Sequence, residues 1–421
     1  MSKALGMRCV WGLCGVLGSV LALASVARAE VSTDVSGSVL VFPKVVFDGG
    51  LLIDAGNDGR DTVIQISNTS NNLVHAHCFY VNGAPDAFGQ PLWQVTDFTI
   101  WLTRQQPTHW VAGEGRQVNP SDNFPGGQDG SGLDPGGVPP VPPGFQGELK
   151  CVQIDASGTP FGGNNLKGEA VIQSADGDVS KHNAVAILAN PDLAGDDPAN
   201  ELLLNNTPQN DGEYNSCPNQ LYLDHFVDGF DNPVISDIGE NGTSLNPAAC
   251  AGGLCPIRTY LTLVPCSQDF ENQVPADVTV QFAIVNEFEQ IFSASTTVTC
   301  WETTRLADID APTGTCTSNA QPCTRDSQCI DADQGFCNKN SVFSLGTLGG
   351  GSAFTRISPV DLDGGVIGVA EEYMYNNNVG SGDVRVARAA WNLQQAGNRY
   401  DATVNLPGGP VVDTITIPES F

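Results

Sequence analysis

Four cysteines lie close together in the segment CTSNAQPCTRDSQCIDADQGFC, and thiols can either form disulfides or bind a metal ion. Their spacing, C-x6-C-x5-C-x7-C, lacks the short C-x2-C pairs that are typical of zinc sites. A polar segment that buries little apolar surface gains stability from cross-links instead. We expect two disulfides here, with metal binding as the alternative, among Cys316, Cys323, Cys329 and Cys337.

Aspartates near Gly- and Asn-rich turns could supply oxygen ligands to Ca²⁺, which prefers several carboxylate and carbonyl oxygens. In the first such segment Gly56 occupies a ligand position and Gln65 stands where an EF-hand has its bidentate Glu, so the segment is not an EF-hand. The other segments are equally partial, and solvated turns are the alternative. The candidates for a structural calcium site are Asp54, Asp58, Asp331, Asp333, Asp361 and Asp363.

Catalytic patterns are weak in this sequence. It contains no G-x-S-x-G and no H-E-x-x-H motif. His75 and His77 lie two apart, so they point the same way on a strand, but packing is a commoner role for such a pair than metal binding. Paired carboxylates are unremarkable in an acidic chain, although a glycosidase pair can be imagined at Glu371 with Glu372 or at Glu287 with Glu289. We expect no enzyme and no cofactor beyond structural calcium.

Three tryptophans precede the Gly- and Pro-rich stretch 113–147, which we expect to be a long loop. Aromatic rings that line a loop can stack against sugars, so Trp93, Trp101 and Trp110 form a candidate ligand platform. Packing inside the core or between sheets is the favoured alternative for such large side chains.

The first 29 residues have the pattern of a secretory signal peptide. Lys3 and Arg8 give a basic start, residues 10–26 are mostly apolar or small, and Ala27-Arg28-Ala29 matches a small-x-small cleavage site. No later run reaches the ~18 apolar residues of a membrane-spanning helix. We expect a secreted, extracellular or cell-surface protein, with the periplasm as an alternative, and no membrane insertion.

Export to an oxidising compartment makes disulfides the default state of the other cysteines. Of 13 cysteines, Cys9 and Cys14 lie in the leader, so eleven remain and at least one is unpaired within the chain. Cys78 and Cys151 both fall within predicted strands, and we expect them to pair. We also expect a Cys266–Cys300 pair, since each residue ends a strand. The pairing of the remaining three stays open: Cys217, Cys250 and Cys255.

The chain is strongly acidic, with a formal net charge of −29. Removing Lys3, Arg8 and Arg28 leaves 15 basic residues against 47 acidic ones, which gives −32. Nucleic acid is excluded as a partner, because binding to phosphates requires clustered Lys and Arg. The apolar residues occur in strand-like runs, so the acidity does not indicate disorder.

Two similar hairpins organise the predicted fold, one over residues 61–83 and one over residues 277–301. If Cys78 faces the core, strand alternation places Val74, Ala76 and Tyr80 beside it and His75, His77 and Phe79 on the opposite face. Pro43 interrupts the first β-branched run and predicts an edge strand or a bend. The segments GVIGVAEEYMY and RAAWNLQQ fit either strands or short helices.

Short strands with Gly- and Asn-rich turns, and no long amphipathic helix, indicate an all-β protein. We predict two tandem antiparallel β-sandwich domains of immunoglobulin-like type. The first covers residues 30–191, residues 192–216 form a connector, and the second covers residues 217–421 with a cysteine-rich insertion at 312–341.

The pattern TVIQISNTSNNLVHAHCF resembles the repeating units of bacterial secreted proteins with tandem immunoglobulin-like domains. The four-cysteine segment is similar to short cysteine-rich inserts in extracellular proteins. This resemblance implies a secreted β-sandwich protein and brings no known active residue.

Taken together, these features favour a non-catalytic extracellular or cell-surface protein with a structural or adhesive role, acting through sandwich loops and strand edges. Its expected partners are a second copy of the chain, a cell-surface protein or a glycan. The first alternative is a fibre-forming subunit that uses its N-terminal strand, VSGSVLVFP. The second is a carbohydrate-binding module or a glycoside hydrolase.

Overall fold

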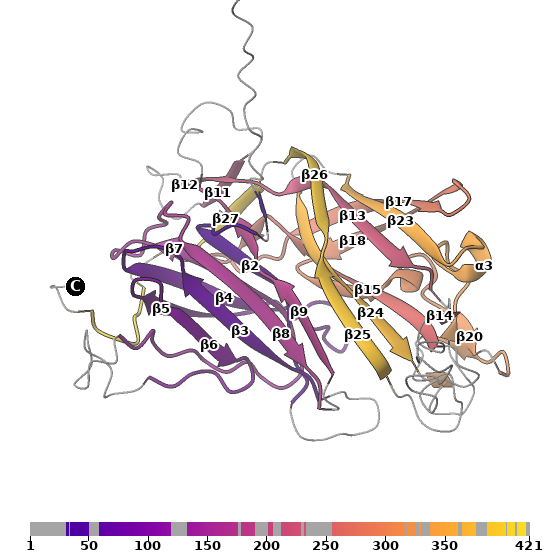
Figure 1. Cartoon of the computed structure of the whole chain (residues 1–421), viewed down its shortest axis with the longest axis horizontal. Coiled ribbons are helices and arrows are strands. Elements are labelled where there is room, and N and C mark those ends of the chain that lie inside the picture. Colours follow the sequence, from indigo (N-terminus) through magenta and orange to yellow (C-terminus); the bar gives the residue numbers. More distant parts are fainter. Residues whose placement is uncertain are drawn as a thin grey trace, which may run out of the picture.

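The computed structural model describes residues 31–32, 34–49, 59–118, 133–175, 178–189, 201–204, 212–228, 231–232, 255–316, 318–324, 328–329, 337–360, 364–375, 385–400, 402–408 and 411–417. Within these residues the chain is nearly all β, as the sequence predicts (Figure 1). The predicted signal peptide, all six calcium candidates and Cys250 lie outside the described residues.

The first sandwich packs a six-stranded sheet against a four-stranded sheet, with every neighbouring pair antiparallel. The six-stranded sheet has the order β1 (Val31–Ser32), β10 (Val185–Ile187), β2 (Val39–Phe47), β7 (Phe145–Ile154), β4 (Val74–Asn82) and β5 (Gln94–Leu102). The four-stranded sheet has the order β6 (Pro107–Val111), β3 (Asp61–Asn68), β8 (Leu166–Gln173) and β9 (Val179–Asn183).

The second sandwich packs two five-stranded sheets face to face. The first has the order β18 (Ile291–Thr299), β17 (Asp277–Asn286), β23 (Ser352–Pro359), β13 (Pro218–Phe226) and β26 (Gln394–Arg399). The second has the order β14 (Asp231–Asn232), β15 (Cys255–Pro265), β24 (Val366–Tyr375) and β25 (Arg385–Asn392), with β19 (Glu302–Arg305) also paired to β15. The two ambiguous segments are therefore strands.

Smaller elements complete the second sandwich. The cysteine-rich insertion forms a three-stranded sheet in the order β21 (Pro322–Cys323), β20 (Gly314–Cys316) and β22 (Cys337–Asn338). Short helical segments among the described residues of this half include η5 (Leu306–Asp308) and α3 (Leu345–Leu348).

The side chains of β4 that the sequence predicts to face the core do so. Val74, Ala76, Cys78 and Tyr80 face the core of the first sandwich. The opposite face is buried too, because Phe79 and other apolar residues of the six-stranded sheet belong to a second core. A strand buried on both faces reads as continuously apolar, so this sheet is the middle layer of the molecule rather than an outer one.

A further sheet covers that opposite face and is built from distant parts of the chain. It has the order β12 (Gly212–Asn215), β11 (Glu201–Leu204), β27 (Ala402–Asn405) and β16 (Gln268–Asp269). Leu202, Tyr214 and Val404 pack there against Val41 and Val152 of the first sandwich. The described part of the expected connector, 192–216, contains β11 and β12, whose buried apolar residues make them paired strands of this sheet.

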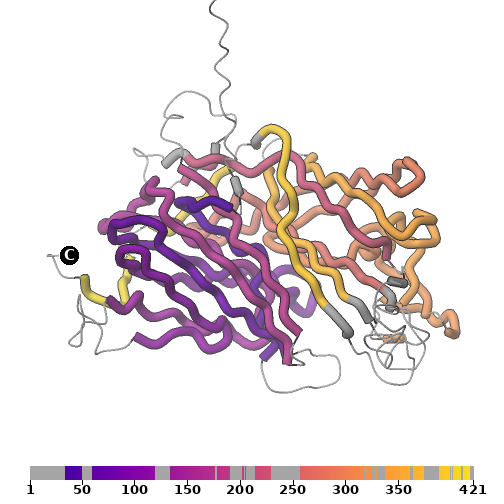
Figure 2. The backbone as a smooth tube through the Cα atoms, in the orientation of Figure 1, coloured from indigo at the N-terminus to yellow at the C-terminus, as the bar shows by residue number. Residues whose placement is uncertain are grey.

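The end of the chain returns to the first sandwich, as the yellow segment in Figure 2 shows. Asp413 accepts a hydrogen bond from Thr99 Oγ1 at 2.8 Å and lies 2.7 Å from His75 Nε2. Ile415 packs beside Trp101. Residues 411–417 thus contact β4 and β5, although they follow the last strand of the second half in sequence.

A buried polar seam joins the two sandwiches. Lys44 Nζ on β2 forms a salt bridge with Glu371 on β24, and both side chains are almost fully buried. Tyr373 Oη donates to the same carboxylate at 3.1 Å, and the Trp301 indole N–H donates to the Pro43 carbonyl at 2.7 Å. Burial would raise the pKa of Glu371, but the charge of Lys44 lowers it, so the carboxylate stays ionised.

A bulge in β2 directs Lys44 into this seam. The register of β2 against β7 shifts between Phe42 and Val45, and Pro43 lies in the shift. The bulge lets Phe42 and Val45 both face the first core while Lys44 points toward the second sandwich. Pro43 therefore marks a bend in a central strand, as one of the two sequence interpretations states.

The seam continues on both sides of this ion pair. Gln268 accepts a hydrogen bond from Lys150 and donates one to Glu148, and all three side chains are buried. Strands β9 and β25 lie side by side (Figure 1), where Asn183 and Asn392 exchange hydrogen bonds of 3.0 and 2.8 Å. These bonds fix the orientation of one sandwich relative to the other.

The disulfides confirm one expected pair and correct another. Cys78 and Cys151 are bonded across neighbouring strands, as predicted. Cys266 pairs with Cys217 instead of Cys300, so the predicted Cys266–Cys300 bridge is wrong. Gly365 explains the difference, because it packs against Cys217 while its carbonyl accepts the Cys266 backbone N–H at 2.9 Å. Cys300 is a buried free thiol, and burial raises its pKa.

We predict that Lys44→Met destabilises the whole protein, because it leaves the Glu371 charge buried without its cationic partner. The expected loss in the free energy of unfolding is ~3–5 kcal/mol, measured by urea titration. The matched control is Lys181→Met, since Lys181 pairs with Glu169 at 2.6 Å on the surface and is 51% exposed. That control should cost at most ~1 kcal/mol. Equal effects of the two variants would contradict a structural role for the seam.

We also predict that Cys300 resists alkylation in the native protein and reacts once guanidinium unfolds the chain, because its thiol is buried and protonated. Peptide mapping without reduction should recover Cys217 linked to Cys266. Recovery of a Cys266–Cys300 peptide would refute the assignment.

Candidate functional site

The three tryptophans do not form a platform. Trp93, Trp101 and Trp110 are at most 8% exposed and belong to three different apolar clusters. Trp101 stacks on the His75 ring with a centroid distance of 3.8 Å, and the Trp110 indole N–H donates to Tyr80 Oη at 2.5 Å. Burial removes these rings from solvent, so packing, the favoured sequence interpretation, holds and the candidate platform does not form.

The two strand histidines are structural in this fold. His75 and His77 are both buried, and their Nε2 atoms lie 2.7 Å from Asp413 and 2.9 Å from Asp97 respectively. Each imidazole therefore has a carboxylate partner of its own. The structure does not bring the two rings together around a common point.

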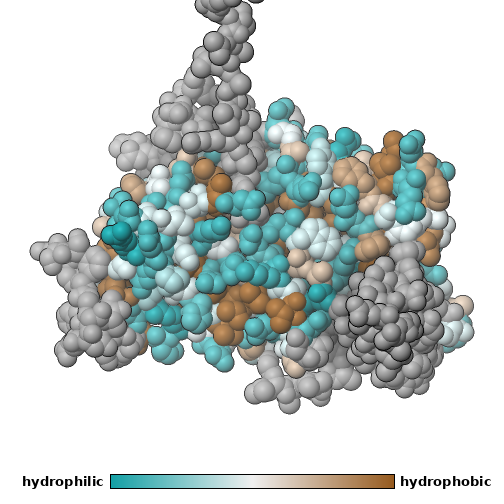
Figure 3. All heavy atoms as spheres, viewed as in Figure 1, coloured by the Kyte–Doolittle hydropathy of each residue, from teal (hydrophilic) through white to brown (hydrophobic). Residues whose placement is uncertain are grey.

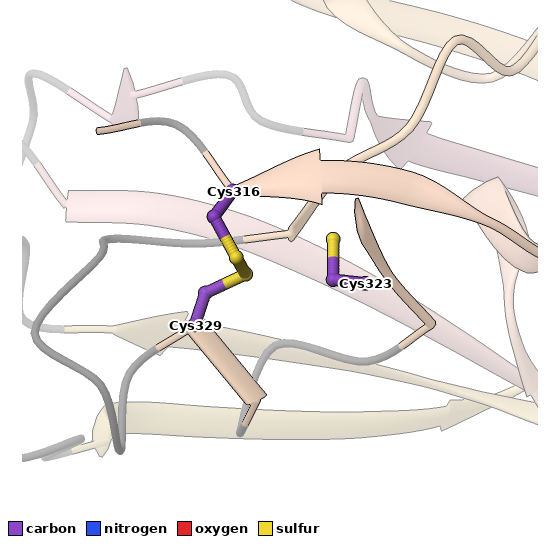
Figure 4. Close-up of side chains that lie close together, drawn as sticks. All are labelled: Cys316, Cys323 and Cys329. Carbon is purple, nitrogen blue, oxygen red and sulfur yellow. A yellow bond between two sulfur atoms is a disulfide. The ribbon is translucent and has the colours of Figure 1, made fainter. Parts of the chain in front are cut away.

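The four cysteines of the insertion form two disulfides, as predicted. The pairs are Cys316–Cys329 and Cys323–Cys337. Cys323 lies beside the Cys316–Cys329 bond (Figure 4), and the sulfur atoms of these three residues lie within 4.8 Å of one another. Sulfurs in disulfides carry no thiolate charge, so this compact group works as a cross-link.

A cavity with a volume of about 660 Å³ opens on the second sandwich. We call it the β13 cleft, and it is defined by residues from five strands and the β17–β18 turn: Asp224, Phe226, Val285, Glu287, Ser352, Phe354, Glu372 and Trp391, with His225, Asn286 and Ala353. Apolar and aromatic groups form its walls, and three carboxylates line it. No lysine or arginine lines the cleft among the residues that the structure describes.

The cleft exists because one long strand changes sheets. β25 pairs with β24, and after Leu393 the chain continues as β26, which pairs with β13 only over Pro218–Tyr222. On its other edge β13 pairs with β23 as far as Phe226. Among the described strands, the segment 223–226 thus has a neighbour on one edge only. The cleft extends from the other edge, where Trp391 of β25 lines it, across the ends of β23 and β17.

Glu372 closes the inner end of this open edge. It accepts hydrogen bonds from the Phe226 backbone N–H at 2.9 Å and from Thr259 Oγ1 at 3.3 Å. Burial raises the pKa of Glu372 despite these bonds. Glu287 lies at the outer end, where Ser352 donates to it from both its backbone N–H at 3.2 Å and its hydroxyl at 2.8 Å.

His225 does not provide an acid or base to the cleft. Its Nδ1 lies 2.9 Å from the Phe226 carbonyl and its Nε2 lies 2.9 Å from Thr355 Oγ1, which fits a neutral ring that donates to the first and accepts from the second. Burial lowers its pKa to about 4. The ring is therefore neutral at physiological pH and has no free nitrogen.

Exposed apolar side chains lie near the cleft entrance. Phe354 is 39% exposed within it, and Phe288 and Ile291 are 63% and 74% exposed in the adjoining β17–β18 turn region. Figure 3 shows a face that is mostly hydrophilic, with apolar side chains gathered in a few patches. Clustered exposed apolar groups beside a cavity are typical of a binding surface.

Glu287 and Glu372 are members of the two carboxylate pairs that the sequence offers, and the structure separates both pairs. Glu371 enters the seam while Glu372 faces the cleft, and Glu289 does not line the cavity. No local pattern in the sequence marks Asp224, Phe226 and Trp391, because they line the cleft through strand pairing between distant segments.

No protein-family model matches this chain, and a comparison with curated proteins found no match. Among the described residues, no helix has the length and apolar content needed to cross a membrane. The resemblance to tandem immunoglobulin-like secreted proteins therefore remains an expectation.

We predict that Glu372→Gln gains stability relative to the native protein as pH rises. The folded state raises the pKa of this carboxyl above its ordinary value of 4.5, so the folded protein retains a proton that the unfolded chain releases. Stability from this group is complete below that value and is lost as pH rises through the folded pKa. Urea titrations of both proteins between about pH 4 and about pH 8 test this. A difference that stays constant with pH would contradict it.

Proposed function

We propose that this chain is a non-catalytic extracellular or cell-surface binding protein with an adhesive role, and that the β13 cleft is its contact site. The observation that carries the proposal is the cleft itself: an open cavity of about 660 Å³ with aromatic walls and carboxylate acceptors. Cavities of this size and composition are typical of sites for small ligands or single side chains of a larger partner.

The hydrogen bonds around the cleft support binding rather than catalysis. His225, the one imidazole that lines it, is neutral and has both nitrogens engaged. Glu287 and Glu372 already accept bonds from Ser352 and from the Phe226 backbone. A nucleophile or general base needs a free and activated group, and these contacts leave the residues as fixed acceptors.

Secretion is supported by the four disulfides in the described residues, which are typical of oxidising compartments. The fibre alternative receives less support. β2 contains most of the N-terminal strand and already pairs with β10 on one edge and β7 on the other. It therefore has no free edge with which to complete the sheet of a neighbouring molecule.

The proposal is tested by filling the cleft. Ser352→Trp places an indole at the entrance without altering the core, because Ser352 is exposed and lines the cavity. Wild type and variant are applied to a glycan microarray and to an array of immobilised random peptides. We expect a subset of the arrayed glycans or peptides to bind the wild type. The binding signal of that subset should fall at least about tenfold with the variant.

The matched control is Ser295→Trp, which makes the same change at an exposed position on β18 outside the cleft. This control should bind the same features as the wild type. If no array feature binds in a manner that depends on Ser352, the cleft is not the contact site and the proposal fails.

A further inference from the structure

Beside its cavity, the β13 cleft contains a short stretch of β13 edge with which no described strand pairs. β26 leaves β13 after Tyr222, so the next residues of β13 face the cleft instead of a neighbouring strand. Glu372 takes up the Phe226 N–H, and Thr259 Oγ1 approaches the Phe226 carbonyl at 3.4 Å. Asp224 lies two residues before Phe226 on the same strand, and no described strand pairs with this edge there. An extended chain can add to such an edge by backbone hydrogen bonds.

The side chains around this edge indicate what such a chain carries. Phe226, Phe354 and Trp391 supply aromatic surface, while Asp224, Glu287 and Glu372 supply carboxylates. Lysine and arginine combine an apolar stem with a cationic head, so they can cover an aromatic wall while the head reaches a carboxylate. Cationic groups also find no competing lysine or arginine in the described lining.

We propose that the β13 cleft binds an extended basic peptide segment of a partner protein, which adds as a strand to β13 in line with β26. This inference rests on the proposed function and specifies its ligand. Alternate residues of the peptide point into the cleft, where a lysine or arginine lies between Trp391 and the carboxylates. The remaining residues of the peptide point away from the cleft.

The charge of the protein argues for a basic partner segment and against a second copy of this chain. The formal net charge of −29 repels another copy and attracts cationic segments during encounter. A basic strand can alternate cationic and apolar residues, which matches a cleft lined by both carboxylates and aromatic side chains. A neutral glycan would use the aromatic rings but would gain nothing from backbone pairing with β13.

The test uses a random heptapeptide library displayed on phage. The library is selected on the intact wild-type protein after depletion on Ser352→Trp. We expect the selected sequences to be enriched in Lys or Arg at alternating positions, separated by apolar residues. Affinity of a selected synthetic peptide should fall about tenfold or more when its central amide is N-methylated, because that change removes a strand hydrogen bond.

Two protein variants separate the charge from the fold. Asp224→Asn with Glu287→Gln should weaken the peptide about tenfold, and the loss should shrink in high salt. Asp277→Asn is the matched control, since Asp277 is an exposed carboxylate on β17 outside the cleft. This variant should bind the selected peptide with the affinity of the wild type. Titration calorimetry gives each dissociation constant, and thermal melting confirms that each variant is folded.

Several outcomes overturn the inference. Acidic or uncharged selected sequences, or no enrichment at all, would exclude a basic strand ligand, and indifference to N-methylation would exclude strand addition. If the arrays show binding that depends on Ser352 to glycans alone, the proposed function stands and this inference fails. If neither array binds in that manner, both fail.

Discussion

The buried ion pair between Lys44 and Glu371 is the constraint on which the arrangement of the two sandwiches depends. Two charges removed from water are stable only when they face each other closely, so the sandwiches must meet in one orientation. Tyr373 and Trp301 add hydrogen bonds around the pair. An interface held by directional polar groups has less freedom to slide than one held by apolar contact alone.

The same strand connects this seam to the β13 cleft. Consecutive residues of β24 point to opposite faces, so Glu371 enters the seam while Glu372 enters the cleft. The continuation from β25 to β26 has a similar effect, because Asn392 bonds to the first sandwich just before the chain crosses to β13. The open edge of β13 is thus held by elements that are themselves fixed by the seam. A rigid edge of this kind suits a binding site, since little ordering is needed when a ligand arrives.

Local sequence patterns predicted the strands and the inward face of β4 well. Alternation along a strand is a local property, so Val74, Ala76 and Cys78 could be assigned to the core before the fold was known. The partners of the opposite face could not be assigned, because they come from residues such as Leu202 and Val404, far away in the sequence. The same limit applies to Cys266, whose bond to Cys217 depends on how Gly365 brings two strand ends together.

The candidate site shows the same division between local and distant information. Glu287 and Glu372 are visible as acidic residues in strand-like segments, but their joint position follows from the pairing of β17, β23 and β13. Packing is the favoured sequence interpretation for the three tryptophans and the structure buries them, but a large aromatic side chain near a loop has the same local signature whether it is exposed or buried, so the sequence leaves the ligand platform open as well.

Both sandwiches and the sheet built from distant parts of the chain form one unit, in which the seam holds the β13 cleft in place. Differential scanning calorimetry of the intact chain tests this coupling most directly. We expect a single transition whose calorimetric and van't Hoff enthalpies agree, because the shared core and the buried ion pair couple the two sandwiches. Two resolved transitions, each with the enthalpy of one sandwich, would contradict it.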